Sequence, residues 1–405
     1  FWDVENLSLS YAYSDQEYHD VITQYENTRT YRGSLAWQHN PKPIAIKPFE
    51  NIGFISKSKW TKLIKDFNVN LGFKQLTART AIDRTYLERL VRANPDLEGL
   101  PPVPTYNKTF TWNTQYGFRY EITKNLKVDF SANRNSIVGE PPGRVNTKDR
   151  PNYELWKDSV LQSIGKFGLP TQYDHNVNVT YTLPLDKLPL TDWITLNARY
   201  GFNYNWTAGQ FLRNTTGNFT TDPRTGNTIQ NSANKQLNGN FTLTTLYNKV
   251  PFLKKINSPK PKTSERKGPG GKDVKPKENE KDGIKKPGDE KAEQDTTKGK
   301  KAPKIKEKKK GEIPAGVRFV GKMLMGIKTV GFTYSETEGT TLPGYLGYSS
   351  VMGQDLDLTS PGFPFVFGSQ SDIRAKAVNG RWITADTALN NPLTRTYTSN
   401  FSGRS

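Results

Sequence analysis

The sequence lacks the residues on which disulfide frameworks and most metal sites depend. Its 405 residues include no cysteine and only three histidines, His19, His39 and His175, which are far apart. No HxxxH pair, GxSxG motif or carboxylate series at metal-ligand spacing is present. Zinc sites need clustered cysteine or histidine, and α/β-hydrolases need the GxSxG turn. We therefore expect no metal, no cofactor and no enzymatic activity.

Long hydrophobic runs are missing as well. Hydrophobic residues make up 34% of the chain, the mean hydropathy is −0.75, and no run approaches 18 apolar residues. A membrane-spanning helix needs about 20 such residues in succession. The sequence therefore excludes a helical membrane protein, but not a β-barrel, whose hydrophobic residues are spread over alternating positions.

Such alternation is the strongest pattern present. From Ile194 to Trp206 every second residue is apolar or aromatic, while the residues between them are mostly polar. A period of two separates the two faces of a β-strand. At about 3.4 Å per residue the strand would reach roughly 40 Å, enough to cross a bilayer when tilted.

The pattern recurs along the chain. The other segments that we predict as strands are Leu7–Tyr13, Tyr31–Trp37, Phe67–Phe73, Phe110–Tyr120, Leu126–Asn133, Val177–Leu183, Phe241–Tyr247, Leu324–Tyr334 and one that starts near Thr394. Thr123–Asn125 is typical of a hairpin turn. Trp112, Trp193 and Trp206 stand near strand ends, where an interfacial aromatic girdle would lie. The fold class that we predict is all-β: about ten up-and-down strands forming an arc of a transmembrane β-barrel wall.

The alternation also assigns side chains to faces. The residues expected to face a polar lumen are Arg119, Lys127, Asp129, Asn197, Arg199 and Asn203. Those expected to face lipid are Phe118, Val128, Leu196, Phe202, Tyr204 and Trp206. A wall of amides and hydroxyls is wet and adheres poorly to passing protein.

Connection lengths suggest how the strands are oriented. The connections expected at residues 123–125 and 184–192 are short, whereas those at 79–107, 137–174, 207–236 and 335–380 are long. Short turns of outer-membrane barrels face the periplasm. Strand alternation then puts residues 42–65 and the Lys-rich tract 254–312 on the periplasmic side as well.

One long connection contains a helix candidate, at about residues 153–167. Trp156, Val160, Ile164 and Phe167 recur at helical spacing after Pro151, and Gly168 follows as a stop. Loop packing and partner binding both fit so short a helix. The domain organisation that we predict is strands 1–8 within residues 1–253, an insertion at 254–312, and strands 9–10 within 313–405.

The net charge of +19 is concentrated in that insertion. Residues 254–312 contain 21 Lys or Arg and 11 Asp or Glu, with no Phe, Trp or Tyr. Such a composition cannot bury a core by itself. Because no aromatic residue is interleaved for base stacking, we expect a solvated insertion and no nucleic-acid partner.

Other functions share parts of this pattern. A secreted β-sandwich adhesin also alternates apolar and polar positions, although its strands are shorter. A nutrient transporter or an outer-membrane enzyme could use the same barrel. The chain starts without Met and stops within a strand pattern, so we expect a segment of a longer protein with strand partners beyond this sheet.

Several short, separated sequence segments resemble the SprA (Sov) family. They are Phe1–Leu7 with Tyr11–Tyr13, Asn40–Pro43 with Lys47–Phe49, Leu188–Trp193, Tyr247–Lys255, Thr340–Tyr345 and Pro361–Gly368. That family forms the outer-membrane translocon of the type IX secretion system in Bacteroidetes and supports gliding motility. The resemblance implies a giant single-chain barrel that conducts folded cargo proteins with a C-terminal signal. It also implies a PorV-like shuttle protein, a periplasmic plug protein and motor components as partners.

Overall fold

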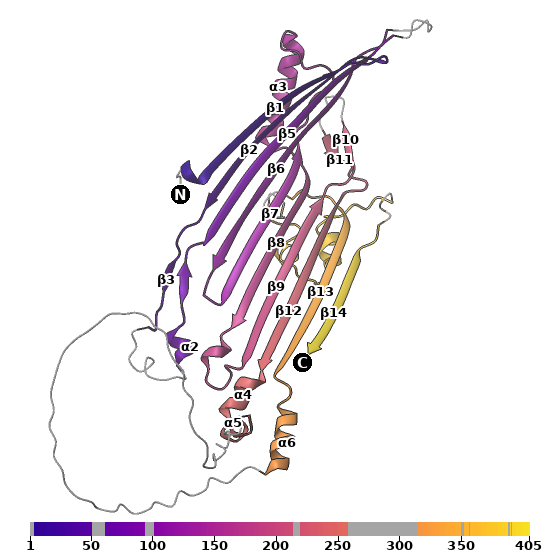
Figure 1. Cartoon of the computed structure of the whole chain (residues 1–405). Helices are drawn as coiled ribbons and strands as arrows, with labels where there is room; N and C mark the ends of the chain where they lie inside the picture. Colours follow the sequence, from indigo (N-terminus) through magenta and orange to yellow (C-terminus); the bar gives the residue numbers. More distant parts are fainter. Residues whose placement is uncertain are drawn as a thin grey trace, which may run out of the picture. The chain divides into compact units, whose positions relative to one another are not determined.

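The computed structural model describes residues 4–50, 61–93, 101–213, 219–257, 314–349, 352–355, 357–387, 389 and 391–405. Its main element is an antiparallel sheet of ten strands, in the order β1-β2-β5-β6-β7-β8-β9-β12-β13-β14 (Figure 1). The strands are β1 (Leu7–Tyr18), β2 (Thr23–His39), β5 (Gln75–Val91), β6 (Thr105–Glu121), β7 (Leu126–Ile137), β8 (Leu169–Leu183), β9 (Ile194–Thr207), β12 (Asn227–Thr242), β13 (Thr329–Tyr345) and β14 (Thr394–Arg404). Within the described residues the sheet is open, with β1 and β14 as its edges.

Smaller elements fill the connections. Two short hairpins pair β3 (Ile44–Ile46) with β4 (Val69–Leu71) and β10 (Phe211–Arg213) with β11 (Phe219–Thr221). The helices are η1 (Val4–Asn6), α2 (Lys62–Lys65), α3 (Arg150–Gly165), η2 (Leu185–Lys187), α4 (Leu243–Lys249), α5 (Pro251–Asn257), α6 (Ala315–Leu324), α7 (Phe363–Val366) and α8 (Arg374–Asn379). No helix of the described residues is both long and apolar enough to cross a membrane.

The chain divides into two compact units, 1–243 with 328–405, and 244–327. The first contains the sheet, and the second contains α5 and α6. The predicted insertion 254–312 lies outside the described residues except for its first four. Eight strands of the sheet precede it and two follow it.

Each strand of the sheet has two chemically different faces. The register sets Phe118 opposite Phe130 and Arg119 opposite Asp129, so aromatic residues gather on one side and polar residues on the other. The same division continues from β1 to β14. We call these sides the aromatic face and the polar face. The predicted period of two and the number of strands in the sheet are confirmed.

Several predicted strand positions are wrong. The third strand of the sheet is β5 at Gln75–Val91, not Phe67–Phe73, of which only Val69–Leu71 forms a short hairpin strand. The strand expected at Phe241–Tyr247 is β12, which ends at Thr242 and is followed by α4. β13 begins at Thr329 rather than Leu324, which ends α6, and continues to Tyr345. Three of the long connections are accordingly shorter than expected, at 92–104, 138–168 and 208–226, whereas the fourth lies further along the chain, at 346–393.

The predicted helix is confirmed as α3, three residues earlier than expected. Pro151 stands in its first turn, where the missing N–H breaks no hydrogen bond. The helix ends at Gly165, and Phe167 and Gly168 follow with positive φ angles of 59° and 68°. This reversal leads the chain directly into β8.

Connections on the two ends of the sheet differ in length. One end carries 19–22 and the four long connections 92–104, 138–168, 208–226 and 346–393, and we call it the long-loop end. The other, the short-turn end, carries the tight turns 122–125 and 184–193. Connections 40–74 and 243–328 also start and finish at the short-turn end, because an antiparallel meander alternates ends at every strand.

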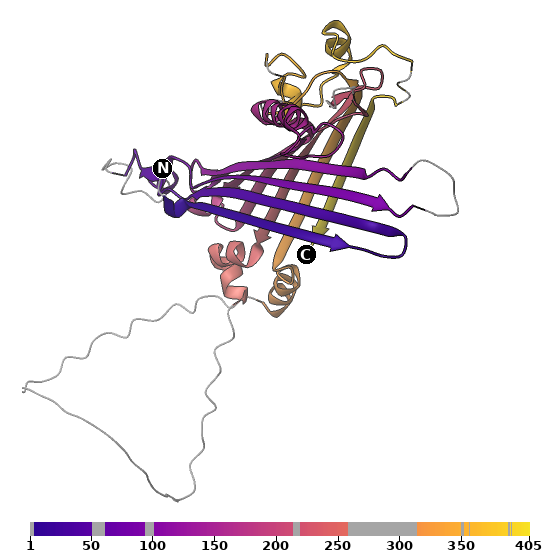
Figure 2. The same ribbon diagram turned by 90° about the horizontal axis from the view of Figure 1, so that it is seen from above.

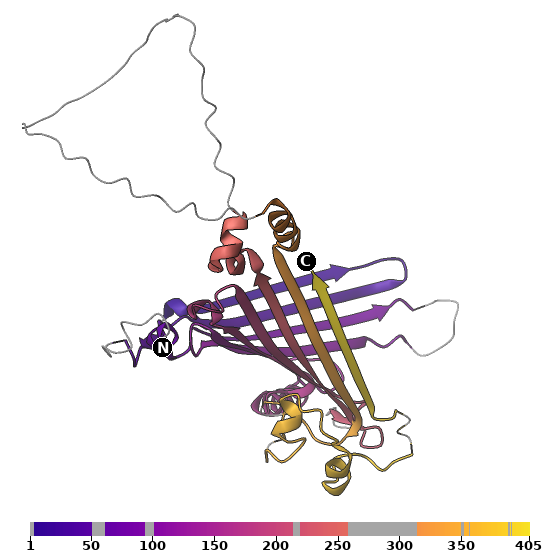
Figure 3. The ribbon, with the colours of Figure 1, turned by 90° about the horizontal axis from the view of Figure 1, so that it is seen from below.

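A second layer covers part of the aromatic face near the long-loop end. It consists of α3 and the segment 346–393 with α7 and α8, which lie on the same side of the sheet (Figures 2 and 3). The main core lies between the sheet and the segment 346–393. Its fully buried side chains include Tyr173, Tyr204, Trp206, Ile229 and Val366.

Candidate functional site

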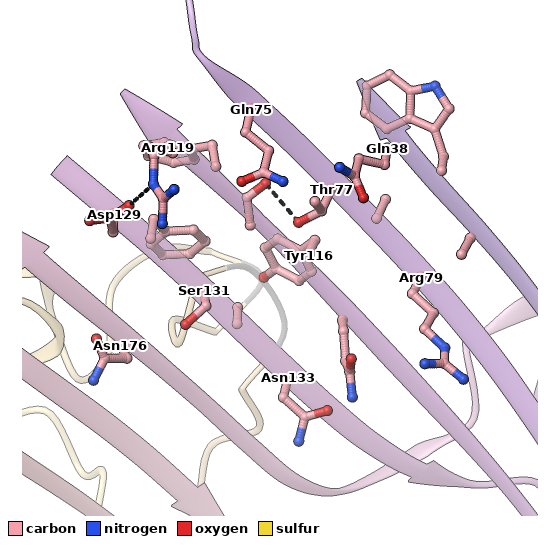
Figure 4. A pocket seen from close by; sticks show the side chains of 18 of the residues that line it. Gln38, Gln75, Thr77, Arg79, Tyr116, Arg119, Asp129, Ser131, Asn133 and Asn176 are labelled. Carbon is pink, nitrogen blue, oxygen red and sulfur yellow. Dashed lines mark hydrogen bonds and ion pairs between the residues drawn. The ribbon is translucent and has the colours of Figure 1, made fainter. Parts of the chain in front are cut away.

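The polar face is the largest chemically uniform surface of the sheet. On β6 to β12 it carries Asn, Thr, Ser, Gln and Gly with a few charged residues. A hollow of about 720 Å³ lies over its middle strands (Figure 4). Its polar lining includes Gln75, Thr77, Arg79, Asn133 and Asn176, which come from three different strands.

Several charged side chains on the polar face are paired with one another. Arg119 Nε lies 2.6 Å from Asp129 Oδ1, and Arg32 Nε lies 2.7 Å from Asp83 Oδ2. Lys127 approaches Glu121 at 3.2 Å. Exposed pairs of this kind add little to stability, but they cancel each other's fields. The polar face therefore carries little net charge at these three pairs.

Amide side chains form a network across the same face. Asn113 Nδ2 donates to the Oδ1 atoms of Asn133 and Asn135 at 2.7 and 2.6 Å. On the next strands Asn176 donates to Asn203, and Arg199 Nη2 donates to Asn178 Oδ1 at 2.8 Å. Because these groups are already hydrogen-bonded to each other, another polypeptide would gain little by binding them.

All six residues predicted to face a lumen lie on the polar face. Arg119 and Asp129 pair at the hollow, Lys127 is two residues from Asp129, and Asn197, Arg199 and Asn203 follow one another along β9. The six residues predicted to face lipid lie on the aromatic face. Phe118, Val128 and Leu196 are half-buried there among side chains of neighbouring strands.

Three of the lipid-facing predictions are wrong. Phe202, Tyr204 and Trp206 are only 7%, 1% and 0% exposed. The cause is the segment after β13, which folds back over this part of the aromatic face. Phe367 meets the Phe202 ring edge-on at 5.6 Å, and Phe365 meets Tyr204 in the same way at 6.2 Å. These three side chains therefore contact protein and not lipid.

Polar residues within the aromatic face hold this segment in place. Asn231 Nδ2 donates to the carbonyl oxygens of Phe365 and Ser369 at 2.8 and 2.9 Å, and Asn231 Oδ1 accepts from Gln370 at 3.1 Å. Thr340 Oγ1 donates to Gln370 Oε1 at 2.8 Å. Asn231 and Thr340 are buried, so these hydrogen bonds to the segment replace the ones that their side chains would otherwise make to water.

Two further polar groups anchor the segment on β8 and β9. His175 Nε2 lies 3.1 Å from the carbonyl oxygen of Val366, and Trp206 Nε1 donates to that of Gly347 at 3.0 Å. A hydrogen bond from His175 to a carbonyl requires the proton on Nε2. His175 thus has a structural partner 191 residues away in the sequence.

Two glycines allow the segment to lie close to the sheet. Gly353 and Gly368 have φ angles of +84° and +85°, which side-chain-bearing residues rarely adopt. A Cβ atom would stand 2.8 Å from Tyr204 at the first position and 2.6 Å from Phe202 at the second. Both the backbone conformation and the contact therefore require glycine.

The other covering element, α3, is attached through a buried ion pair. Arg84 on β5 donates to both carboxylate oxygens of Glu140 at 2.5 and 2.9 Å, and Trp156 Nε1 of α3 donates to Glu140 Oε2 at 2.9 Å. Burial alone would raise the pKa of Glu140. The donors Arg84 and Trp156 nevertheless hold the pKa of that carboxyl below its usual value.

These anchoring residues escaped the sequence analysis. His175, Asn231 and Arg84 interrupt the apolar series on β8, β12 and β5. These interruptions were the only feature of the sequence that could have pointed to an anchoring role. A polar residue on an otherwise apolar strand face needs a partner when it is buried. The partners lie in loops that no local pattern connects to these strands.

The described residues contain no group of three or more His, Cys, Asp or Glu that could hold a metal ion. A search of family models found no match to the chain, and a search of curated proteins found none either.

Proposed function

We propose that the chain forms part of the wall of a transmembrane β-barrel in the outer membrane of a Gram-negative bacterium. The aromatic face would meet lipid over part of its height, and the polar face would line a water-filled lumen. One observation carries the proposal: outside the covered region, the aromatic face contains a continuous belt without charged residues.

The belt crosses every strand of the sheet. Its members are the aromatic-face residues within 7–13, 31–37, 76–82, 110–120, 126–128, 179–183, 194–200, 237–241, 330–334 and 397–401. From Phe110 to Tyr120 it runs for ten residue steps, about 34 Å along the strand. Tilting by about 40° leaves roughly 26 Å across the membrane, close to the belt height of known barrels.

Charged residues border the belt toward the long-loop end. They are Asp15, Arg29, Arg84, Lys108, Arg134, Lys235, Glu336 and Arg395, each on the aromatic face of its strand. Lys235 Nζ lies 3.0 Å from Glu336 Oε1 in this border. A change from apolar to charged residues at one level of successive strands is expected where lipid gives way to water.

The belt runs obliquely to the strands. One row of directly paired residues leads from His39 through Phe118 and Phe202 to Glu338. On β2 the belt lies to the long-loop side of this row, and on β13 it lies to the short-turn side. Strands of closed barrels tilt by 35–45°, so a level belt must cross them obliquely. A soluble sandwich has no reason for such an offset.

For the function, we propose a protein-conducting channel of the type IX secretion system. The resemblance to the SprA family supports this proposal, and the neutral amide surface of the polar face suits the passage of folded cargo. On this account the partners are cargo proteins with a C-terminal signal, a PorV-like shuttle protein and a periplasmic plug protein. The short-turn end would face the periplasm, and neither catalysis nor a cofactor is involved.

One observation favours a second function. The layer over Tyr204 and Trp206 is what a secreted β-sandwich adhesin would show along its whole aromatic face. That alternative predicts a protein covering for the belt too, and release of the protein into buffer without detergent.

Site-specific photocrosslinking tests the channel. A benzoylphenylalanine replaces Asn197 or Asn203 in the full-length protein, and a cargo fused to a tightly folded domain is stalled during export. We expect adducts with cargo from both positions and none from Leu196, the matched control on the opposite face. Cargo adducts from Leu196 alone, or from none of the three positions while export proceeds, would contradict the proposal.

A further inference from the structure

The second compact unit contains two helices that pack on each other. Gly321 of α6 faces Ile256 of α5, and a Cβ atom at Gly321 would stand 2.9 Å from Ile256 Cδ1. Ile256 is fully buried. Tyr247 OH donates to the carbonyl oxygen of Ile327 at 3.1 Å, which joins the two ends of the unit. The helices therefore form one body with a defined outer surface.

Large apolar side chains cover much of that outer surface. Phe319 and Met323 on α6 are 71% and 76% exposed, and Phe252 on α5 is 51% exposed. Val317 and Val320 are exposed beside them. At about 100° per residue, Phe319, Met323 and Val320 lie on the side of α6 away from Gly321, whereas Val317 lies one turn before Gly321 and beside it. So many exposed apolar groups on ten residues indicate a binding surface.

The charged residues that the structure describes in and beside these helices are all basic. The segments 243–257 and 314–328 contain Lys249, Lys254, Lys255, Arg318, Lys322 and Lys328 and no Asp or Glu. On α6, Arg318 and Lys322 lie one turn apart, between the apolar side and the Gly321 side. An apolar surface with purely cationic flanks complements a membrane surface that carries negative headgroups.

We propose that α5 and α6 bind an anionic phospholipid surface, with Phe319 and Met323 inserted among the acyl chains and the basic residues at the headgroups. The inference rests on the proposed membrane location of the sheet. Only the four residues Met325–Lys328 separate α6 from β13 in the sequence, and that end of β13 would itself lie at the interface. Binding there would fix the β12–β13 connection to the membrane.

Depth-dependent fluorescence quenching tests the inference. Phe319→Cys is labelled with a nitrobenzoxadiazole dye in the full-length protein, which is reconstituted into phosphatidylcholine vesicles with or without phosphatidylglycerol. Lys322→Cys is the matched control on the same helix, and Leu196→Cys reports on the sheet. With doxyl groups on the acyl chains and phosphatidylglycerol present, we expect quenching at residue 319 to exceed that at residue 322 about twofold or more. Omitting phosphatidylglycerol should remove most of this difference.

The outcomes separate the two proposals. Quenching at residue 196 without quenching at residue 319 would overturn the lipid-binding helices and leave the barrel wall intact. Quenching at neither position would overturn both. Equal quenching at 319 in the two kinds of vesicle would overturn the preference for anionic lipid. Because residues 319 and 322 are exposed, neither substitution is expected to disturb folding.

Discussion

At the scale of single residues, the polar interruptions of the aromatic face are the informative positions. Asn231 lies between Tyr204 and Thr340 in the sheet and binds three groups of the segment 346–393. An apolar residue there would extend the belt, but it would leave buried carbonyl groups without donors. Such residues mark where the sheet is covered by another segment of the chain.

Asn231→Ala should therefore release the covering segment. We expect a loss of about 2–3 kcal/mol in the stability of its folded state, since buried carbonyls and Gln370 lose their partner. Limited proteolysis within 346–393 measures this loss as a higher cleavage rate. Asn234→Ala is the control on the same strand, where an exposed amide donates to Thr337 at 2.9 Å. Equal cleavage of the two variants would contradict the assignment.

The attachment of α3 should depend on pH. The pKa of Glu140 is held below its ordinary value of 4.5, so its contribution is complete above that value and is lost as the pH falls through the lowered pKa. Fluorine NMR of fluorotryptophan-labelled protein, with Trp156 assigned through Trp156→Phe, should show the Trp156 signal shifting on acidification below pH 4.5. In Glu140→Gln this transition should disappear. An unchanged transition in that variant would show that another group titrates.

At the scale of elements, the sequence predicted strands best where the aromatic face is unbroken. β9 carries apolar or aromatic residues at every second position and was found in full. β5 was placed wrongly because Thr80, Arg84 and Glu88 occupy its aromatic face. β12 was also placed wrongly, because Asn231 and Lys235 interrupt its aromatic face. Their partners, such as Glu140 for Arg84, come from distant segments. Local periodicity cannot reveal a strand whose polar residues are stabilised by tertiary contacts.

The covering segment could not be predicted for the same reason. Its short helices α7 and α8 have no long amphipathic pattern, and its contacts with β9 join residues more than 140 positions apart. The sequence assigned the faces of Phe202, Tyr204 and Trp206 correctly but not what covers them. Alternation identifies an apolar face, and both lipid and protein are apolar surroundings.

Gly368→Ala should loosen this segment as a whole. The φ angle of +85° is unfavourable for alanine, and the added Cβ would stand 2.6 Å from Phe202. We expect a cost of at least about 2 kcal/mol. Hydrogen exchange of the peptides from α7 and α8 measures it. Gly165→Ala at the end of α3, where a Cβ meets open space, should be neutral or slightly stabilising. Slow exchange retained in Gly368→Ala would contradict the packing described above.

At the scale of the whole molecule, the open sheet is the feature that a membrane does not tolerate. β1 and β14 are exposed along their whole length, and each has one edge without a strand partner among the described residues. Unpaired N–H and C=O groups cost several kcal/mol each in hydrocarbon. If the sheet forms the barrel wall proposed above, both edges must therefore be paired with strands outside the described sheet.

Hydrogen exchange of the full-length protein in lipid nanodiscs tests this closure. If both edges are paired, the amides of β1 and β14 should exchange as slowly as those of the interior strand β12, which has a strand partner on each side. Detergent-free membranes from the producing cells provide the matched sample. Fast exchange at every second amide of β1 or β14, with β12 protected, would show an open edge and contradict a closed barrel.

The central claim is that lipid meets one face of this sheet and water the other, and the adjacent residues Leu196 and Asn197 test it most directly. Each is replaced by arginine in the full-length protein, and the free energy of folding into phospholipid vesicles is measured. We predict that Leu196→Arg costs up to about 2–4 kcal/mol, whereas Asn197→Arg costs far less because its side chain enters water. Equal costs at the two positions would contradict the account.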